Sequence, residues 1–206
     1  MMFGKVQISS VIFDLDGTLT KTPSPWQHVH ERLGVWDNPA CLHLDEWLSG
    51  KIVYEEFCRK DTSLWRGRSV DEIHALLDEI PFNRHVPAVV DRLVARRIPS
   101  IIISSGFRYV AAKIQAQCGW DPLLIYANEL VDGPKVRINV SGDFQSPISK
   151  KALAAQALKM VGSTLSQTLV VSDTTRDLDQ LRDCEYKLHV REEDDLLRVN
   201  DYLPYD

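Results

Sequence analysis

The sequence lacks several features that would assign it to a special class of protein. No apolar run approaches the length needed to span a membrane, and the first seven residues contain no signal-peptide core. The histidines show no metal-ligand spacing, and we find no internal repeat or low-complexity linker. The cysteines are scattered without CxxC spacing, as expected of reduced thiols, at positions Cys41, Cys58, Cys118 and Cys184. We therefore expect a cytoplasmic protein without a membrane segment or a disulfide framework.

The composition is typical of a soluble globular protein. An apolar content of 44% and a charged content of 26% in 206 residues indicate one domain, or one domain with an insertion, that buries a sizeable core. A formal net charge of −5 argues against general nucleic-acid binding but leaves room for a local basic pocket. The sequence does not indicate an oligomeric state.

The secondary-structure pattern divides the chain into two parts. Residues 21–85 show helical periodicity and no strand pattern, and a capping box at Ser69 and Glu72 marks one helix start. The helices expected there are 25–33, 42–48, 52–65 and 70–77. The remaining residues alternate strand with helix, which predicts an α/β core with a parallel sheet. The strands expected there are 11–13, 99–104, 123–126, 135–140, 168–171 and 186–190. The strand at 135–140 is expected to follow a turn at Asp132-Gly133. We expect the charged tail from Arg191 onward to be peripheral.

Two carboxylates follow the first apolar run. Asp14 and Asp16 come directly after Val11-Ile-Phe13, and side chains two residues apart on an extended chain point the same way. Gly17 allows the backbone to turn sharply just beyond them. Because like charges this close repel each other, such a pair needs a cation or a shared proton.

Polar groups also follow the later strands of the predicted sheet. They are Ser104, Ser105 and Gly106 after the second strand, Lys150 at the start of an Ala-rich helix, and Asp173 and Asp177 after the strand at 168–171. The carboxyl ends of parallel strands meet at one edge, so these groups should lie near the first carboxylate pair. Hydroxyl and N–H groups suit phosphate oxygens, a lysine offsets crowded carboxylates, and hard carboxylate oxygens suit Mg²⁺.

The order and chemistry of these motifs resemble the haloacid dehalogenase-like (HAD) phosphohydrolases. Asp14-Leu-Asp-Gly-Thr18 after an apolar strand resembles their first motif. Three further stretches resemble the phosphoserine-phosphatase-type branch: Ser-Ser-Gly-Phe at 104–107, Leu165–Asp173 and Gly50–Gly67. The resemblance implies a Rossmann-like parallel-sheet core made of residues 1–20 and 86–206, with a small helical cap of the C1 type at 21–85.

The resemblance also implies a reaction and the residues that perform it. It implies a Mg²⁺-dependent phosphomonoesterase for a small soluble phosphate ester, in which Asp14 is the nucleophile and forms an aspartyl-phosphate. Asp16 would protonate the leaving oxygen and then deprotonate the water. The phosphoryl group would be held by Ser104 and Lys150, assisted by N–H groups of Ser105 or Gly106. Lys151 stays open as the alternative to Lys150.

The implied metal ligands are four aspartates. Asp173 would complete the Mg²⁺ shell beside Asp14 and the backbone carbonyl of Asp16, and Asp177 would lie in the shell or just behind it. The fourth motif departs from the usual Gly-Asp, because Ser172 precedes Asp173.

The predicted cap departs from the phosphoserine-phosphatase pattern. Where those enzymes carry a cap glutamate this chain has Lys-Thr-Pro-Ser-Pro at 21–25, and near their cap arginine it has Asp61. With no carboxylate near Pro23 to pair a substrate ammonium, we expect phosphoserine to be a poor substrate relative to uncharged or anionic esters. The residues expected on the substrate side of the cap are Trp26, His30, Tyr54 and Arg59, with solvent as the alternative for Arg59.

Other functions stay open at this point. A dehalogenase or phosphonate hydrolase would dispense with the acid–base carboxylate at Asp16. Phosphoserine phosphatase activity proper, or phosphoryl transfer to a second hydroxyl acceptor, needs no different core residues. A catalytically silent binding domain would be expected to lack Asp14, Asp16 or Lys150, and all three are present.

Overall fold

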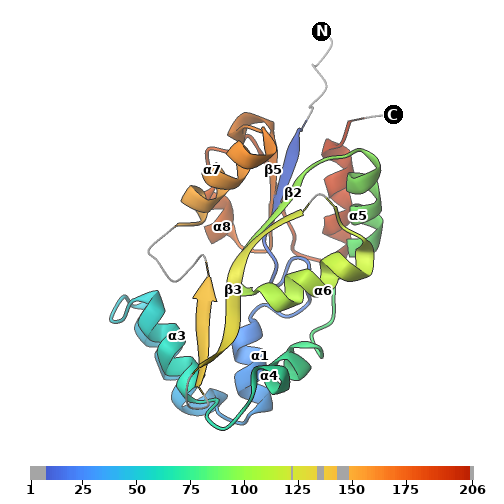
Figure 1. Cartoon of the computed structure of the whole chain (residues 1–206). Coiled ribbons are helices and arrows are strands. Elements are labelled where there is room, and N and C mark those ends of the chain that lie inside the picture. Colours follow the sequence, from blue (N-terminus) through green and yellow to red (C-terminus); the bar gives the residue numbers. More distant parts are fainter. Residues whose placement is uncertain (1–7, 122, 134–136, 143–148, 205–206) are drawn as a thin grey trace.

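Helices and strands alternate through most of the chain (Figure 1). The computed structural model describes residues 8–121, 123–133, 137–142 and 149–204. The strands are β1 (Ser10–Phe13), β2 (Ser100–Phe107), β3 (Leu123–Gly133), β4 (Arg137–Gly142), β5 (Thr168–Ser172) and β6 (Tyr186–His189). The α-helices are α1 (Pro25–Arg32), α2 (Cys41–Leu48), α3 (Tyr54–Ser63), α4 (Val70–Leu77), α5 (Val86–Ala95), α6 (Arg108–Cys118), α7 (Lys150–Val161) and α8 (Thr175–Gln180). Short helical segments are η1 (Trp36–Ala40), η2 (Leu165–Gln167) and η3 (Glu193–Tyr202).

The strands form one sheet in the order β4-β3-β2-β1-β5-β6. Neighbouring strands from β3 to β6 run parallel, which confirms the predicted α/β fold with a parallel sheet. β1 lies in the middle, where Phe13 is in register with Ile102 of β2 and Val171 of β5. The residues that follow these three strands are therefore brought to the same edge.

Helices cover both faces of the sheet (Figure 1). Successive side chains of a strand point to opposite faces, and β1 shows the result. Val11 and Phe13 join a large apolar cluster that includes buried residues of α5, α6 and η3. Ile12 joins a smaller cluster with residues of α7 and α8. Because both faces are covered, the middle of the sheet is apolar on both sides, as in Val11–Phe13 of β1, Ile101–Ile103 of β2 and Leu169–Val171 of β5.

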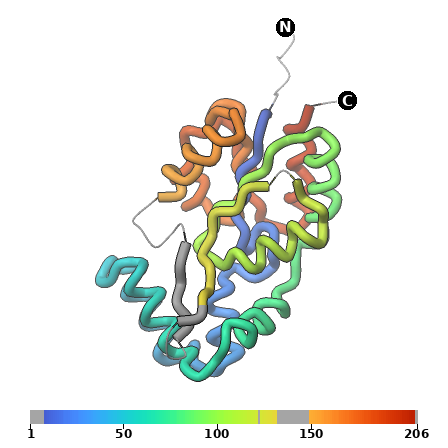
Figure 2. Tube along the Cα trace, in the orientation of Figure 1, coloured from blue at the N-terminus to red at the C-terminus, as the bar shows by residue number. Residues whose placement is uncertain are grey.

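The helices α1 to α4 lie together at the carboxyl end of the sheet (Figures 1 and 2). The chain leaves the sheet and returns to it through two segments that run side by side, with a bridge between Thr20 and Phe82. Two backbone hydrogen bonds flank this bridge, from Lys21 to Pro81 (2.9 Å) and from Asn83 to Leu19 (2.9 Å). The four helices thus form an insertion whose entering and leaving segments are paired with each other. The limits of a separate domain at residues 21–85 stay a prediction.

β4 differs from the expected parallel arrangement. It runs antiparallel to β3, pairing Asn128–Gly133 with Arg137–Gly142. β3 is longer than the sequence indicated and continues through Asp132 and Gly133, where we expected a turn. The expected strand start at Lys135 lies outside the described residues. The resulting hairpin projects beyond the parallel strands toward α3 (Figure 1).

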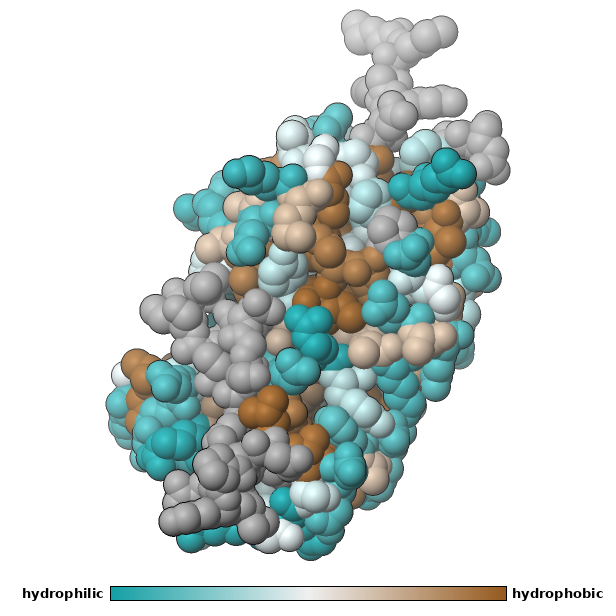
Figure 3. Space-filling model, in the orientation of Figure 1, coloured by the Kyte–Doolittle hydropathy of each residue, from teal (hydrophilic) through white to brown (hydrophobic). Residues whose placement is uncertain are grey.

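The face of the molecule that Figure 3 shows is mainly polar. Apolar side chains gather near the start of β3, before the segment that pairs with β4 (Figure 3). Among the described residues no helix combines the length and the apolar character needed to cross a bilayer. The four cysteines are all free thiols.

The charged tail from Arg191 onward was expected to be peripheral, and this expectation is wrong. Residues 193–202 form η3, and Leu196 and Val199 are 0% exposed. Leu203 is buried as well, and all three belong to the larger apolar cluster. These apolar positions are three and four residues apart, which is the spacing of one helix face. The many charged residues between them hide this pattern in so short a segment.

Replacing Leu196 by alanine tests how much this tail contributes to the core. Removing a fully buried leucine leaves a cavity, so the free energy of unfolding should fall by about 2–5 kcal/mol. Leu197, which is 36% exposed, provides the matched control, and Leu197→Ala should cost less than about 1 kcal/mol. Chemical denaturation of the two variants measures the difference, and equal losses would show that the tail is not part of the core.

Candidate active site

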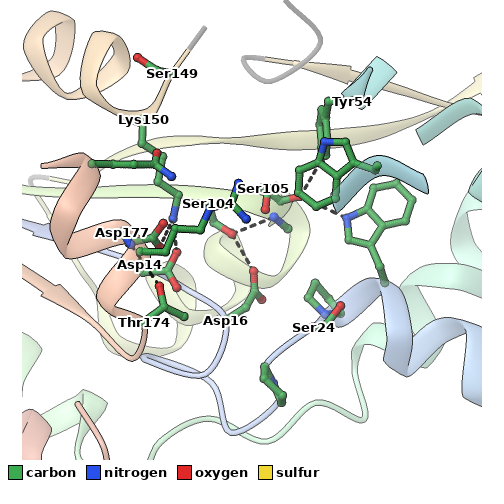
Figure 4. A pocket seen from close by; sticks show the side chains of 17 residues that line it. Asp14, Asp16, Ser24, Tyr54, Ser104, Ser105, Ser149, Lys150, Thr174 and Asp177 are labelled. Atoms are coloured by element: carbon green, nitrogen blue, oxygen red, sulfur yellow. Dashed lines mark hydrogen bonds and ion pairs between the residues drawn. The ribbon is translucent and has the colours of Figure 1, made fainter. Parts of the chain in front are cut away.

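Asp14 and Asp16 lie on the same side of the chain at the end of β1, as their spacing predicts. Leu15 between them is 0% exposed in the apolar core, so the two carboxylates point away from it (Figure 4). The backbone N–H of Asp14 still donates to Val171 of β5 (2.9 Å), which fixes Asp14 at the sheet edge.

Gly17 allows the chain to turn closely around Asp173. Its φ of +78° lies in the left-handed region that favours glycine. An added Cβ would lie 2.3 Å from Asp173 Oδ2. Thr18 ties the two motifs together, because its Oγ1 donates to Asp173 Oδ1 (3.2 Å) and accepts from the Asp173 N–H (2.9 Å).

The carboxyl end of β2 reaches Asp16 through Ser104. Ser104 Oγ donates to Asp16 Oδ2 (2.6 Å) and accepts from the Gly106 N–H (2.8 Å). Gly106 is in close contact with the same carboxylate, since a Cβ added there would lie 2.2 Å from Asp16 Oδ2. The absence of a side chain at Gly106 is therefore what allows this segment to approach the first motif.

Lys150 links the first and fourth motifs. It is the first residue of α7, after Ser149, whose Oγ caps the helix by accepting from Ala152 N–H. Lys150 Nζ lies 2.7 Å from Asp14 Oδ1 and 2.5 Å from Asp177 Oδ2 (Figure 4). Lys151 instead pairs with Asp183 at the surface. The geometry therefore selects Lys150, the first of the two alternatives.

Burial and mutual repulsion disturb the acidic groups. Burial raises the pKa of Asp14 to about 7, although the Lys150 charge opposes this. Burial and the charge of Asp14 raise the pKa of Asp16 to about 8, and burial also raises the pKa of Asp173. Burial opposes the charge of Lys150, but Asp14 and Asp177 outweigh it and raise the lysine pKa. The site thus holds more negative charge than one lysine balances.

These side chains surround a pocket of about 360 Å³. Its walls come from both parts of the chain. The core supplies Asp14, Asp16, Ser104, Ser105, Gly106, Ser149, Lys150, Thr174, Arg176, Asp177 and Gln180, and the inserted part supplies Pro23, Ser24, Pro25, Trp26, Trp47 and Tyr54. The structure therefore brings the predicted phosphate-side residues together in one place, with Asp173 just outside the lining, beside Gly17.

Two of the four expected cap residues reach this pocket. Trp26 Nε1 and Tyr54 OH both donate to the Ser105 carbonyl, at 3.2 and 3.0 Å. Asn128 Nδ2 of β3 donates to the same carbonyl (2.6 Å) and to Tyr54 OH (2.7 Å). One peptide group near the carboxyl end of β2 is thus held from α1, α3 and β3 together.

His30 and Arg59 do not face the pocket, which corrects the expectation for them. His30 is 0% exposed and its ring lies inside the insertion, bonded to Asp61 and Trp65. Arg59 is exposed and pairs with Glu56. Helical spacing identified the buried side of α1 but did not distinguish the part that faces the sheet from the part that faces other helices.

Sequence reasoning missed several residues of the site. Asn128 is 0% exposed, and its one signal is an amide in a run otherwise typical of a strand. Trp47 and Arg176 line the pocket, and the Arg176 guanidinium lies 6.0 Å from the Trp47 ring centre. Neither residue has a local motif, because they meet only when α2 approaches α8.

The donor set of the site suits a hard divalent cation. In the described part of the chain no three acidic, histidine or cysteine side chains form a ready metal cluster. However, Asp16 Oδ1 is buried without a hydrogen-bond partner among the described residues, and the pKa values of Asp14, Asp16 and Asp173 are all raised. Carboxylate oxygens with excess negative charge are the ligands that Mg²⁺ prefers.

Comparison with known proteins assigns the family. The family model of haloacid dehalogenase-like hydrolases matches residues 11–182, which include both acidic motifs, Ser104 and Lys150. The chain belongs to this family. A probable phosphoserine phosphatase of Schizosaccharomyces pombe is 26% identical over 171 residues, which are 82% of this chain and 56% of that protein. This HAD-family chain thus spans little more than half the length of that relative.

Two solved structures share the fold of this HAD-family chain. A substrate-bound phosphoserine phosphatase complex has a TM-score of 0.74 at 19% identity, covering 96% of this chain and 99% of that one. A phospho-aspartyl intermediate analogue of phosphoserine phosphatase has a TM-score of 0.71 at 21% identity, covering 89% and 86%. The insertion and the core are therefore arranged as in phosphoserine phosphatase structures.

Gly106→Ala tests the close approach of the carboxyl end of β2 to Asp16. The added Cβ would overlap the Asp16 carboxylate, and displacing an aligned group by about 1 Å costs on the order of 100-fold in rate. We expect such a loss in kcat/KM for p-nitrophenyl phosphate. Gly34→Ala is the control: its Cβ would meet nothing within 4 Å, and its φ of +68° reports the effect of backbone strain alone, without contact to the site. Equal activity of the two variants would show that this contact does not matter.

Proposed function

We propose that this protein is a Mg²⁺-dependent phosphomonoesterase that acts on a small soluble phosphate ester. The observation that carries the proposal is the position of Asp14, at the end of β1, facing the pocket, with Lys150 Nζ 2.7 Å away. A carboxylate beside a fixed positive charge in a pocket suits nucleophilic attack on a phosphoryl group that the same lysine binds.

The proposed reaction has two displacements. Asp14 attacks phosphorus, the bond from phosphorus to the ester oxygen breaks, and Asp16 gives its proton to the departing alcohol. Water then attacks phosphorus of the aspartyl-phosphate, Asp16 takes up a proton, and the bond to Asp14 breaks to release phosphate. The raised pKa of Asp16 favours the protonated form that a general acid needs.

The remaining residues bind and orient the phosphoryl group. Lys150, Ser104 and the N–H groups of Ser105 or Gly106 are the proposed donors. Asp14, Asp173 and the backbone carbonyl of Asp16 would hold Mg²⁺, which neutralises charge on the phosphoryl oxygens. Asp177 bonds to Lys150 and would position the lysine, and direct contact with the metal stays a prediction.

Residues 21–85 are proposed as the cap domain that closes the pocket and selects the leaving group. Support comes from Trp26, Trp47 and Tyr54, which line the pocket from this segment. A cytoplasmic location remains part of the proposal and rests on the cysteine pattern.

Two rival activities share the same core residues. Phosphoserine phosphatase activity is favoured by the relatives' names, and a panel of phosphoserine, glycerol phosphates and hexose phosphates separates it by kcat/KM. A phosphotransferase would release the phosphoryl group to an added alcohol faster than to water. A silent binding domain would turn over none of these esters.

Replacing Asp14 by asparagine tests the nucleophile. The amide keeps the shape but cannot form the acyl phosphate, so kcat should fall by on the order of a thousandfold or more. Asp179→Asn, which removes an exposed carboxylate from α8, is the matched control and should retain full activity. Turnover of p-nitrophenyl phosphate is the measurement. If Asp14→Asn kept near-normal turnover, another residue would have to be the nucleophile.

Metal removal tests the proposed Mg²⁺ site. Dialysis against EDTA should abolish turnover and added Mg²⁺ should restore it, since the crowded carboxylates need a cation. Asp173→Ala should need a higher Mg²⁺ concentration for half-maximal activity and recover only in part. Full activity after EDTA dialysis would rule out the metal.

A further inference from the structure

A second cavity lies within the insertion, next to the phosphate-side pocket. Its volume is about 190 Å³. Since a cavity of about 150 Å³ holds a benzene molecule, it has room for a group of several heavy atoms. It shares part of its wall with the larger pocket, namely Pro23, Ser24, Trp26, Trp47, Tyr54 and Ser105. The two cavities therefore adjoin each other along these six residues.

Five of the ten described residues that line this cap cavity are aromatic. They are Trp26, Trp36, Trp47, Tyr54 and Phe57. The rings pack against one another, with centres 5.2 Å apart for Trp47 and Phe57 and 5.3 Å apart for Trp47 and Tyr54. The faces of such rings attract organic cations, and several rings around one space are typical of sites for methylated ammonium groups.

Among the described residues that line the cap cavity, Asp61 is the one that carries a charge, and it is 2% exposed. Its oxygens contact two imidazoles, Oδ2 at 3.0 Å from His30 Nε2 and Oδ1 at 2.8 Å from His43 Nδ1. No lysine, arginine or histidine is present in the described part of the wall. The electrostatic character of the cavity is therefore set by ring faces and a carboxylate, and both favour positive charge.

Three basic residues near Asp61, namely His30, Arg59 and Lys60, add no unpaired positive charge at the cavity. His30 Nδ1 accepts from Trp65 Nε1 (3.2 Å), and an indole N–H only donates, so His30 carries its proton on Nε2 and is neutral. Arg59 pairs with Glu56 and Lys60 pairs with Glu46. Neither cation lines the cavity, so neither offers a partner for an anionic group there.

We propose that the cap cavity binds a quaternary ammonium group, so that the substrates are phosphate monoesters of N-methylated amino alcohols. This inference rests on the proposed phosphatase function and names its substrate class. Asp61 supplies, from α3, the carboxylate for which we found no candidate near Pro23. The ring faces favour a methylated ammonium, because they offer apolar contact to its methyl groups and attract its charge. A phosphoserine carboxylate would enter beside Asp61 and be repelled.

Two esters of the same shape test the charge preference. Phosphocholine and 3,3-dimethylbutyl phosphate differ only in whether nitrogen or carbon bears the three methyl groups. With the Mg²⁺-loaded full chain we expect kcat/KM to be at least tenfold higher for phosphocholine, which corresponds to about 1.4 kcal/mol in the transition state. A ratio of one or less would overturn the inference.

Variants locate the preference within the cavity. Asp61→Asn keeps the shape of the side chain. The amide oxygen can accept from His30 Nε2, and the amide nitrogen can donate to His43 Nδ1 when His43 carries its proton on Nε2. It should bring the ratio to near one, whereas Asp45→Asn, an exposed carboxylate in the same segment, should leave the ratio unchanged. Trp36→Leu should lower the ratio about threefold or more, since Trp36 lines only the cap cavity. A ratio that survives Asp61→Asn would contradict the assignment.

Binding of choline chloride, followed by calorimetry, separates this inference from the proposed function. Hydrolysis of both esters without preference, and no choline binding, would overturn the inference and leave the phosphatase function standing. Choline binding that Asp61→Asn weakens, with no hydrolysis of any ester, would support the cavity assignment and overturn the function. Neither binding nor hydrolysis would overturn both.

Discussion

The contact of Lys150 with Asp14 and Asp177 is the interaction on which the site depends. One ammonium group joins the end of β1, the start of α7 and the first turn of α8, at 2.7 and 2.5 Å from the two carboxylates. Removing a partner from such a buried group leaves uncompensated charge and costs several kcal/mol. The parallel sheet makes the contact possible because β1 lies between β2 and β5, so that their carboxyl ends share one edge.

A second constraint joins the phosphate side to the insertion. The Ser105 carbonyl accepts from Trp26, Tyr54 and Asn128, directly after Ser104, which bonds to Asp16. The side chains that border the cap cavity thus hold the same backbone segment that would hold the phosphoryl group. A change in the insertion is therefore expected to alter both the choice of leaving group and the alignment of the ester.

Much of the fold and the acidic core of the site was predictable because their signals are local. Two aspartates at a spacing of two after an apolar run must share one side of a strand. Lys150 was the predicted phosphate lysine, but Lys151 stayed open because adjacent residues of a helix point about 100° apart and the sequence does not give the rotation of the helix. The position of His30 depends on how α1 packs against the other helices of the insertion, and the position of Asn128 depends on how far β3 extends. Asp61 was noted as a substitution, but its position in a ring-lined cavity follows only from the packing of α1, α2 and α3.

The central claim is that Asp14 takes up the phosphoryl group during turnover. Rapid acid quenching of the Mg²⁺-loaded enzyme with p-nitrophenyl phosphate, followed by peptide mapping with mass spectrometry, tests it directly. The account predicts a phosphoryl group on the peptide that contains Asp14, sensitive to hydroxylamine as an acyl phosphate should be, and absent from Asp14→Asn. A phosphoryl group on Ser104 or any other residue, formed fast enough to support turnover, would contradict it.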